Sequence, residues 1–188
     1  MTGLDSPDRA TTDDRPEPAR ILLVGMMGSG KTTVARELAR QTRWPMVDND
    51  DLIRTMTARE PAAIAAEDGE GALHDAEAAA LSSALALAPP LIVGVAGAMV
   101  ERPDLRATLR RAGHVVWLRA RPETLRARIG DGADRRPEAV DLGWLAARAA
   151  EREPLYRAVA DQVIEVDDKT PEDIASAILR VAGIPSAG

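Results

Sequence analysis

A glycine-rich segment near the start of the chain carries the residue types that bind phosphate. Residues 25–32 read GMMGSGKT, which fits the pattern G-x-x-x-x-G-K-[ST]. In such a loop the backbone N–H groups surround phosphate oxygens, the lysine reaches the β- and γ-phosphates, and the hydroxyl that follows binds Mg²⁺. The segment therefore predicts a site for a nucleotide and Mg²⁺. Its expected members are Gly25, Met27, Gly28, Ser29, Gly30, Lys31, Thr32 and Thr33, with Thr32 as a metal ligand.

A second segment, MVDNDDLI at residues 46–53, offers carboxylates at the end of a short apolar run. Ligands of open α/β sheets bind at the carboxyl ends of the strands, so these carboxylates are expected to share a crevice with the glycine-rich loop. Asp48 is predicted to hold Mg²⁺ through water, and Asp50 to accept a proton from an acceptor hydroxyl. The simpler interpretation is that Asp50 only caps the helix that follows.

Apolar runs and helical patterns alternate along the chain, and their order indicates how the two segments are positioned. Strands are expected at 21–24, 45–47, 91–97 (with its turn), 114–118 and 162–166. Helices are expected at 32–41, 51–56, 61–67, 72–88, 103–111, 122–129, 142–159 and 171–182. Strands that alternate with helices favour a parallel sheet covered on both faces. We therefore predict an α/β fold with a five-stranded parallel sheet.

Length and composition limit the class of protein. The chain has 188 residues, no cysteine and a net charge of −6, which excludes disulfides and disfavours nucleic acid as the main partner. Residues 1–20 are expected to form a disordered tail, 21–183 a single domain, and 184–188 a frayed end. There is no signal-peptide pattern and no apolar run of the roughly 18 residues that span a membrane, so a cytoplasmic location is expected.

Four segments resemble those of shikimate kinases, small P-loop kinases that transfer the γ-phosphate of ATP to shikimate. They read GMMGSGKTT (25–33), VDNDDLI (47–53), RRP (135–137) and EREPLYR (151–157), and the last is the most specific. The resemblance extends over residues 21–182. It implies the strand order 2-3-1-4-5, ATP and Mg²⁺ as cofactors, a lid at about 130–141, and a monomer.

The resemblance also implies roles for individual side chains. Arg128 is expected to lie along the adenine. Asp50 is expected to bind the acceptor hydroxyls. Arg136, in the lid, is expected to neutralise the transferring phosphate, and Arg152 to pair with the acceptor carboxylate, because a guanidinium recognises both groups bidentately. Lys31, Asp50 and Arg136 are thus the expected catalytic residues.

The acceptor side departs from the family pattern. Where the family has Phe-Arg and a glutamate three residues on, this chain has Leu73, His74 and Glu77, so an imidazole replaces the arginine that holds the acceptor carboxylate. A family phenylalanine is replaced by Ala65. A family triple glycine is replaced by Val95-Ala96-Gly97, and we expect these side chains to crowd the acceptor and to strain any backbone that needs a positive φ. His74 and Gly97 remain the expected acceptor-side positions.

Because the ATP-side residues match the family and the acceptor-side residues partly do not, three hypotheses remain open. The first is a shikimate kinase with a rebuilt acceptor pocket. The second is a kinase of the same fold that acts on another small, hydroxylated and anionic acceptor. The third is a nucleotide-binding protein that transfers no phosphate and serves a regulatory role.

Overall fold

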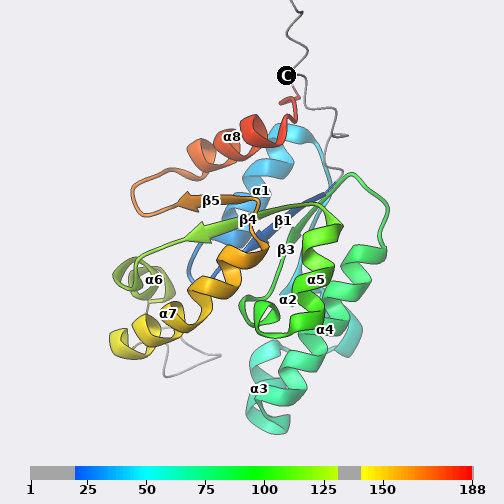
Figure 1. Cartoon of the computed structure of the whole chain (residues 1–188). Helices are drawn as coiled ribbons and strands as arrows, with labels where there is room; N and C mark the ends of the chain where they lie inside the picture. Colours follow the sequence, from blue (N-terminus) through cyan, green and yellow to red (C-terminus); the bar gives the residue numbers. More distant parts are fainter. Residues whose placement is uncertain (1–19, 131–140, 188) are drawn as a thin grey trace, which may run out of the picture.

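One parallel sheet forms the centre of the molecule in the computed structural model, which describes residues 20–130 and 141–187 (Figure 1). Within this part of the chain the strand order is β2-β3-β1-β4-β5, with every neighbouring pair parallel. The strands are β1 (Arg20–Val24), β2 (Met46–Asp48), β3 (Leu91–Gly94), β4 (His114–Arg119) and β5 (Gln162–Glu165). The predicted fold class and the strand order that the resemblance implied are therefore confirmed.

Helices cover both faces of this sheet (Figure 1). They are α1 (Lys31–Thr42), α2 (Asn49–Thr57), α3 (Pro61–Asp68), α4 (Glu70–Ala86), the 3₁₀ helix η1 (Gly97–Glu101), α5 (Pro103–Ala112), α6 (Pro122–Ile129), α7 (Leu142–Val159) and α8 (Pro171–Ala182). None of the helices in the described ranges is long and apolar enough to cross a membrane.

The alternation of side chains along β1 divides the core into two layers. Leu22 and Val24 point into a cluster that α4, α5 and α7 cover. Ile21 and Leu23 point into the opposite cluster, which α1 and α8 cover. All four side chains are at most 1% exposed, as expected for the central strand of a sheet buried on both faces.

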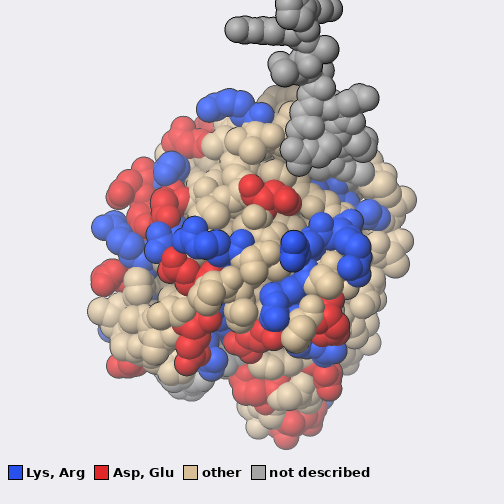
Figure 2. Space-filling view, in the orientation of Figure 1, with Lys and Arg blue, Asp and Glu red and all other residues tan. Residues whose placement is uncertain are grey.

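A smaller cluster joins α2, α3 and α4 into a lobe beside the end of the sheet. Ile53, Ile64, Leu73 and Ala80 form it, and each is at most 4% exposed. In Figure 1 this lobe lies at the bottom of the view, and Figure 2 shows acidic side chains gathered over it. Over the rest of the face in Figure 2, cationic and anionic side chains are interspersed.

The element boundaries differ from the predicted ones by a few residues. α2 begins at Asn49 instead of residue 51, because the side chain of Asp48 caps it by accepting from the amide of Asp50. α4 ends at Ala86 instead of residue 88, consistent with the steric restriction that Pro89 places on the residue before it. Ile184 is only 6% exposed and packs into the cluster under α1 and α8, so packing continues past the end of α8.

Candidate active site

The glycine-rich loop connects β1 to α1 and has the tight turn that phosphate binding requires. Gly28 has a φ of 80°, and a Cβ there would lie 2.8 Å from the carbonyl oxygen of Leu125. A side chain at this position would therefore be strained and would clash with α6. The amide of Ser29 donates to the carbonyl of Met26 at 3.1 Å, which closes the turn. Ser29 is 1% exposed, and its hydroxyl has no hydrogen-bond partner among the described residues.

Lys31 lies where a triphosphate would be expected. Its Nζ donates to the carbonyl oxygens of Gly25 at 2.9 Å and Met26 at 3.1 Å, which bends the ammonium group back over the loop. α1 begins at this residue with Gly30 at its N-cap position and no side-chain cap. The first amides of α1 and the positive end of its dipole are therefore suited to bind an anion.

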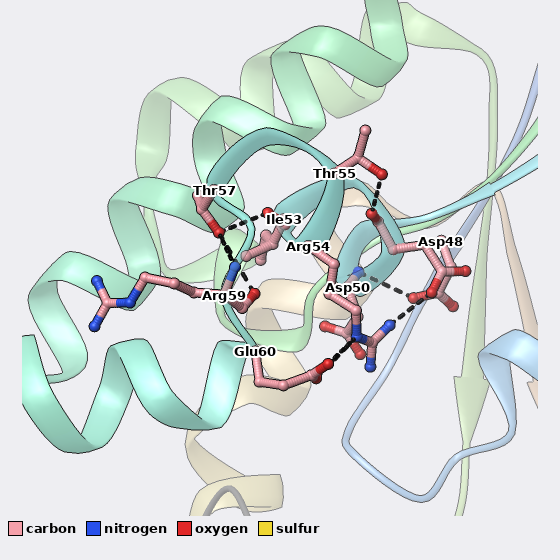
Figure 3. A network of polar contacts seen from close by, with 9 residues as sticks. Asp48, Asp50, Ile53, Arg54, Thr55, Thr57, Arg59 and Glu60 are labelled. Atoms are coloured by element: carbon pink, nitrogen blue, oxygen red, sulfur yellow. Dashed lines mark hydrogen bonds and ion pairs between the residues drawn. The ribbon is translucent and has the colours of Figure 1, made fainter.

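Thr32 and Asp48 meet at the mouth of the loop. The Thr32 hydroxyl donates to Asp48 Oδ2 at 2.6 Å. Asp48 Oδ1 accepts from the Asp50 amide at 3.0 Å (Figure 3). Mg²⁺ in nucleotide sites takes one or two protein oxygens and completes its shell with water and phosphate oxygens. A hydroxyl and a carboxylate oxygen at this separation fit that requirement.

Asp50 lies in the first turn of α2 and lines the same cavity as the loop. The nearby Arg54 pairs with Glu60 at 2.8 Å (Figure 3) and with Asp51 at 2.6 Å. The interpretation of Asp50 as the helix cap is wrong, because Asp48 is the capping side chain. Asp50 therefore lines the cavity and does not cap the helix.

One cavity of about 420 Å³ brings the predicted site residues together. The lining residues that sequence analysis singled out are Met27, Gly28, Gly30, Lys31, Thr32, Thr33, Asp48, Asp50, Leu73, Glu77, Val95, Ala96, Gly97, Arg128 and Arg152. They come from the glycine-rich loop, the start of α1, the end of β2, the start of α2, α4, the turn after β3, α6 and α7. The residues predicted for the nucleotide and those predicted for the acceptor therefore line one cavity. Arg136 and the segment 131–140 lie outside the described residues.

Arg128 is held against the loop by backbone carbonyls. Its Nη2 donates to Val166 at 2.9 Å and its Nη1 to Ser29 at 3.4 Å. The guanidinium plane is thus fixed beside the loop that is expected to hold the phosphates. This placement suits the role that the resemblance implied for Arg128, which is to lie along the base of the nucleotide.

Arg152 is a buried cation that lines the same cavity. The residue is 8% exposed, and its Nε donates to Glu101 Oε1 at 2.7 Å. Its Nη1 lies 3.8 Å from the Met26 sulfur. Next to it, the Tyr156 hydroxyl donates to the Gly97 carbonyl at 2.9 Å. Burial raises the pKa of this phenol, so Tyr156 remains a neutral hydrogen-bond donor.

The turn after β3 accommodates its side chains without backbone strain. Ala96 has a φ of −60°, and Val95 is not among the described residues that have a positive φ. The expected strain at these positions is therefore wrong. Val95 is 1% exposed and also belongs to the core cluster under α4, α5 and α7, which explains why a branched side chain fits there.

The residues of α4 that differ from the family pattern, Leu73 and His74, lie close to other side chains of the protein. Leu73 is 3% exposed and packs into the cluster of the α2–α4 lobe, against which Ala65 packs too. His74 Nε2 lies 3.6 Å from Glu70 Oε2, one turn earlier on the same helix. Among the described residues that line the cavity, Leu73 and Glu77 are present and His74 is not. An acceptor role for His74 stays a prediction.

Gly97 is expected to be the glycine of this turn that stability requires. An added Cβ would lie 3.0 Å from the Gly25 carbonyl, 3.2 Å from the Tyr156 hydroxyl and 3.5 Å from Arg152 Nη1. We expect Gly97→Ala to lower the free energy of unfolding by about 1–3 kcal/mol, because the rigid loop backbone cannot move away. Urea unfolding measures this.

The matched control is Gly71→Ala, since Gly71 lies in α4 and an added Cβ would meet nothing within 4 Å. This change is expected to stabilise the protein by about 0.5–1 kcal/mol. Equal free energies of unfolding in the two variants would contradict the close approach at Gly97.

Comparison with known proteins extends over most of the chain. The family model described as shikimate kinase matches residues 27–182. A shikimate kinase of Symbiobacterium thermophilum is 42% identical over 164 residues, which cover 85% of this chain and 93% of the relative. A shikimate kinase of Rhodopirellula baltica is 35% identical over 176 residues, which cover 90% and 94%.

Solved structures give the same result. The structure of a shikimate kinase from Acinetobacter baumannii in complex with shikimate has a TM-score of 0.78 and 28% identity, covering 87% of this chain and 92% of that one. A shikimate kinase structure from Bacteroides thetaiotaomicron has a TM-score of 0.79, covers 89% of this chain and 99% of that one, and at 22% identity supports the fold alone. The family model, the relatives and the solved structures thus agree on one family.

Proposed function

This chain belongs to the shikimate kinase family, and we infer that it transfers the γ-phosphoryl group of ATP to a hydroxyl of shikimate. The observation that carries this inference is one cavity lined by the phosphate-binding loop, by Asp50 and by the buried Arg152. The first of the three hypotheses is therefore the one we adopt.

Positioning and charge stabilisation supply most of the catalysis in a phosphoryl transfer. We propose that the amides of the glycine-rich loop and of the start of α1 bind the β- and γ-phosphates of ATP. Lys31 exchanges the carbonyls of Gly25 and Met26 for phosphate oxygens, since a charge-assisted contact with phosphate is stronger than one with a neutral carbonyl. Arg128 lies along the adenine, and Arg136 of the lid neutralises the transferring group.

Thr32 and Asp48 are the proposed magnesium residues. Their oxygens are already together, with Asp48 oriented by the amide of Asp50. Thr32 contributes its hydroxyl directly and Asp48 acts through water. Bound Mg²⁺ supplies positive charge to the β- and γ-oxygens.

Asp50 and Arg152 are the proposed acceptor residues. Asp50 accepts a hydrogen bond from the attacking hydroxyl and takes its proton as transfer proceeds. Arg152 pairs with the shikimate carboxylate beside Gly97, whose lack of a side chain leaves room for that approach. His74 takes the family position of a second carboxylate-binding residue, as a weaker partner.

We also propose the organisation that family membership favours. Residues 21–183 form one kinase domain, 130–141 its lid, and the enzyme works as a monomer in the cytoplasm. Gel filtration of the full chain tests the monomer, and a dimer mass would contradict it.

Product analysis tests the proposed reaction. After incubation of the full chain with Mg-ATP and shikimate, mass spectrometry is expected to detect phosphorylated shikimate together with ADP. The detection of ADP and inorganic phosphate alone would show that water is the acceptor and would contradict the inference.

Replacing Arg152 tests the acceptor end separately. We expect Arg152→Ala to raise the KM for shikimate by about tenfold or more, the usual loss when a charged hydrogen-bond partner is removed. The control is Arg157→Ala, which removes an arginine of the same helix that pairs with Glu153 at 3.0 Å on the exposed surface. Steady-state kinetics at saturating ATP measures both variants. An unchanged KM in Arg152→Ala would place the acceptor elsewhere.

A further inference from the structure

Glu101 is the partner of the buried arginine, and no sequence pattern singles it out. It is the last residue of η1, the short helix that follows the turn after β3. Its Oε1 accepts from Arg152 Nε at 2.7 Å and lies 3.6 Å from Arg148 Nη1. Glu101 thus connects the turn beside the cavity to Arg148 and Arg152, which are one helical turn apart on α7.

Burial makes this partner important to Arg152. The arginine side chain is 9% exposed, whereas that of Glu101 is 34% exposed. A guanidinium that is withdrawn from water needs a counter-charge, since an unpaired buried charge is strongly destabilising. Glu101 supplies such a counter-charge, with its Oε1 2.7 Å from Arg152 Nε.

The carboxylate is charged at neutral pH. Partial burial raises the pKa of Glu101, but the hydrogen bond and charge of Arg152 together with the charge of Arg148 outweigh burial and hold the pKa below its usual value. His74, on α4, acts in the same direction. The pair with Arg152 is therefore a full ion pair under assay conditions.

The geometry of the pair separates the two ends of the guanidinium. Nε faces Glu101, which is absent from the described residues that line the cavity. Nη1 lies at the side of Gly97, 3.5 Å from where a Cβ of that residue would be, and both Gly97 and Arg152 line the cavity. Glu101 thus contacts the Nε end of the guanidinium and is not itself one of the cavity residues.

We propose that Glu101 is a positioning residue for the acceptor: it holds the Nε end of Arg152 so that the Nη end faces the cavity and pairs with the acceptor carboxylate. This inference rests on the proposed function and adds a residue to it. The opposite arrangement would have Glu101 compete with the acceptor for Arg152. The placement of Glu101 outside the cavity argues against competition, because an acceptor carboxylate at the Nη end does not need the Nε position.

The test compares three variants of the full chain by steady-state kinetics. Glu101→Ala removes the partner. Glu101→Gln keeps an oxygen that accepts from Nε but removes the charge. Glu151→Ala is the control, since Glu151 is an exposed residue of α7 that pairs with Arg148 at 3.2 Å.

Glu101→Ala is expected to raise the KM for shikimate about tenfold, as for loss of one charge-assisted contact, while kcat and the KM for ATP stay within about threefold of wild type. Glu101→Gln is expected to recover most of this loss, and Glu151→Ala to behave as wild type. A merely structural role would change kcat, the KM for ATP and the melting temperature together.

Circular dichroism of each variant confirms that it is folded. If Glu101→Ala is not folded, Glu101→Gln decides, with an expected rise in the KM for shikimate of about two- to fivefold.

Two results would overturn the inference. A lower KM for shikimate in either variant would show competition, and an unchanged KM in both would show that Arg152 needs no positioning. If the wild-type protein itself shows no response to shikimate, the proposed function fails along with the inference, whereas a normal wild-type response with unchanged variants removes the inference alone.

Discussion

Lys31→Ala is expected to lower kcat for shikimate-dependent ADP release by about 10²–10³, the range for loss of one preorganised charge stabiliser of a transition state. Lys31 is the one cation of the glycine-rich loop, and its Nζ already lies at the loop carbonyls of Gly25 and Met26. The charge that develops on the γ-phosphoryl oxygens would lose this partner at the moment of transfer. A coupled ADP assay at saturating substrates measures the effect.

The chain contains a matched control for this change. Lys169 is the other lysine of the sequence, and its Nζ donates to the Glu165 carbonyl at an exposed position after β5. Lys169→Ala is expected to retain wild-type kcat. Normal turnover in Lys31→Ala would contradict the assignment of the glycine-rich loop as the phosphate site.

Asp50→Asn is expected to lower kcat by about 10²–10⁴, the range that general-base catalysis contributes. The amide keeps the size of the side chain and a hydrogen-bond acceptor, but it cannot take the proton of the attacking hydroxyl. Asp50 lines the cavity, and the side-chain cap of α2 comes from Asp48. The KM for ATP is expected to stay unchanged, so the loss should appear in kcat.

The neighbouring carboxylate is the control for Asp50. The Asp51 side chain is exposed and pairs with Arg54 at 2.6 Å. Asp51→Asn is expected to leave kcat unchanged. Equal kcat values for Asp50→Asn and wild type would show that another group accepts the proton.

Local patterns along the sequence were sufficient for the architecture. Short apolar runs that alternate with helical patterns predicted the parallel sheet, and the motifs added the strand order through their family. The ATP side was predictable for the same reason: Lys31, Thr32 and the glycines belong to one continuous segment, so their spacing alone brings them together. Boundaries were less accurate because caps such as Asp48 depend on where the chain leaves a strand.

The acceptor side was harder to predict because its contacts join distant segments. Glu101 and Arg152 are 51 residues apart, and nothing in the sequence around Glu101 marks it as a partner of α7. The surroundings of the replaced glycines could not be predicted either: Val95 lines the cavity, and its side chain also belongs to the core cluster under α4, α5 and α7. Such burial follows from the tertiary packing and not from the residue type.

One measurement tests whether this family member acts on shikimate despite its altered acceptor residues. It is ADP release from Mg-ATP with and without shikimate, with Lys31→Ala as the blank. We predict that ADP release depends on shikimate, saturates with it, and proceeds at about 1–100 per second, the typical range for kinases. Such a result would mean that Arg152, Glu101 and the Val95-Ala96-Gly97 turn form a working acceptor site without the second family arginine. An ADP release rate that is identical with and without shikimate, from protein that still binds ATP, would contradict it.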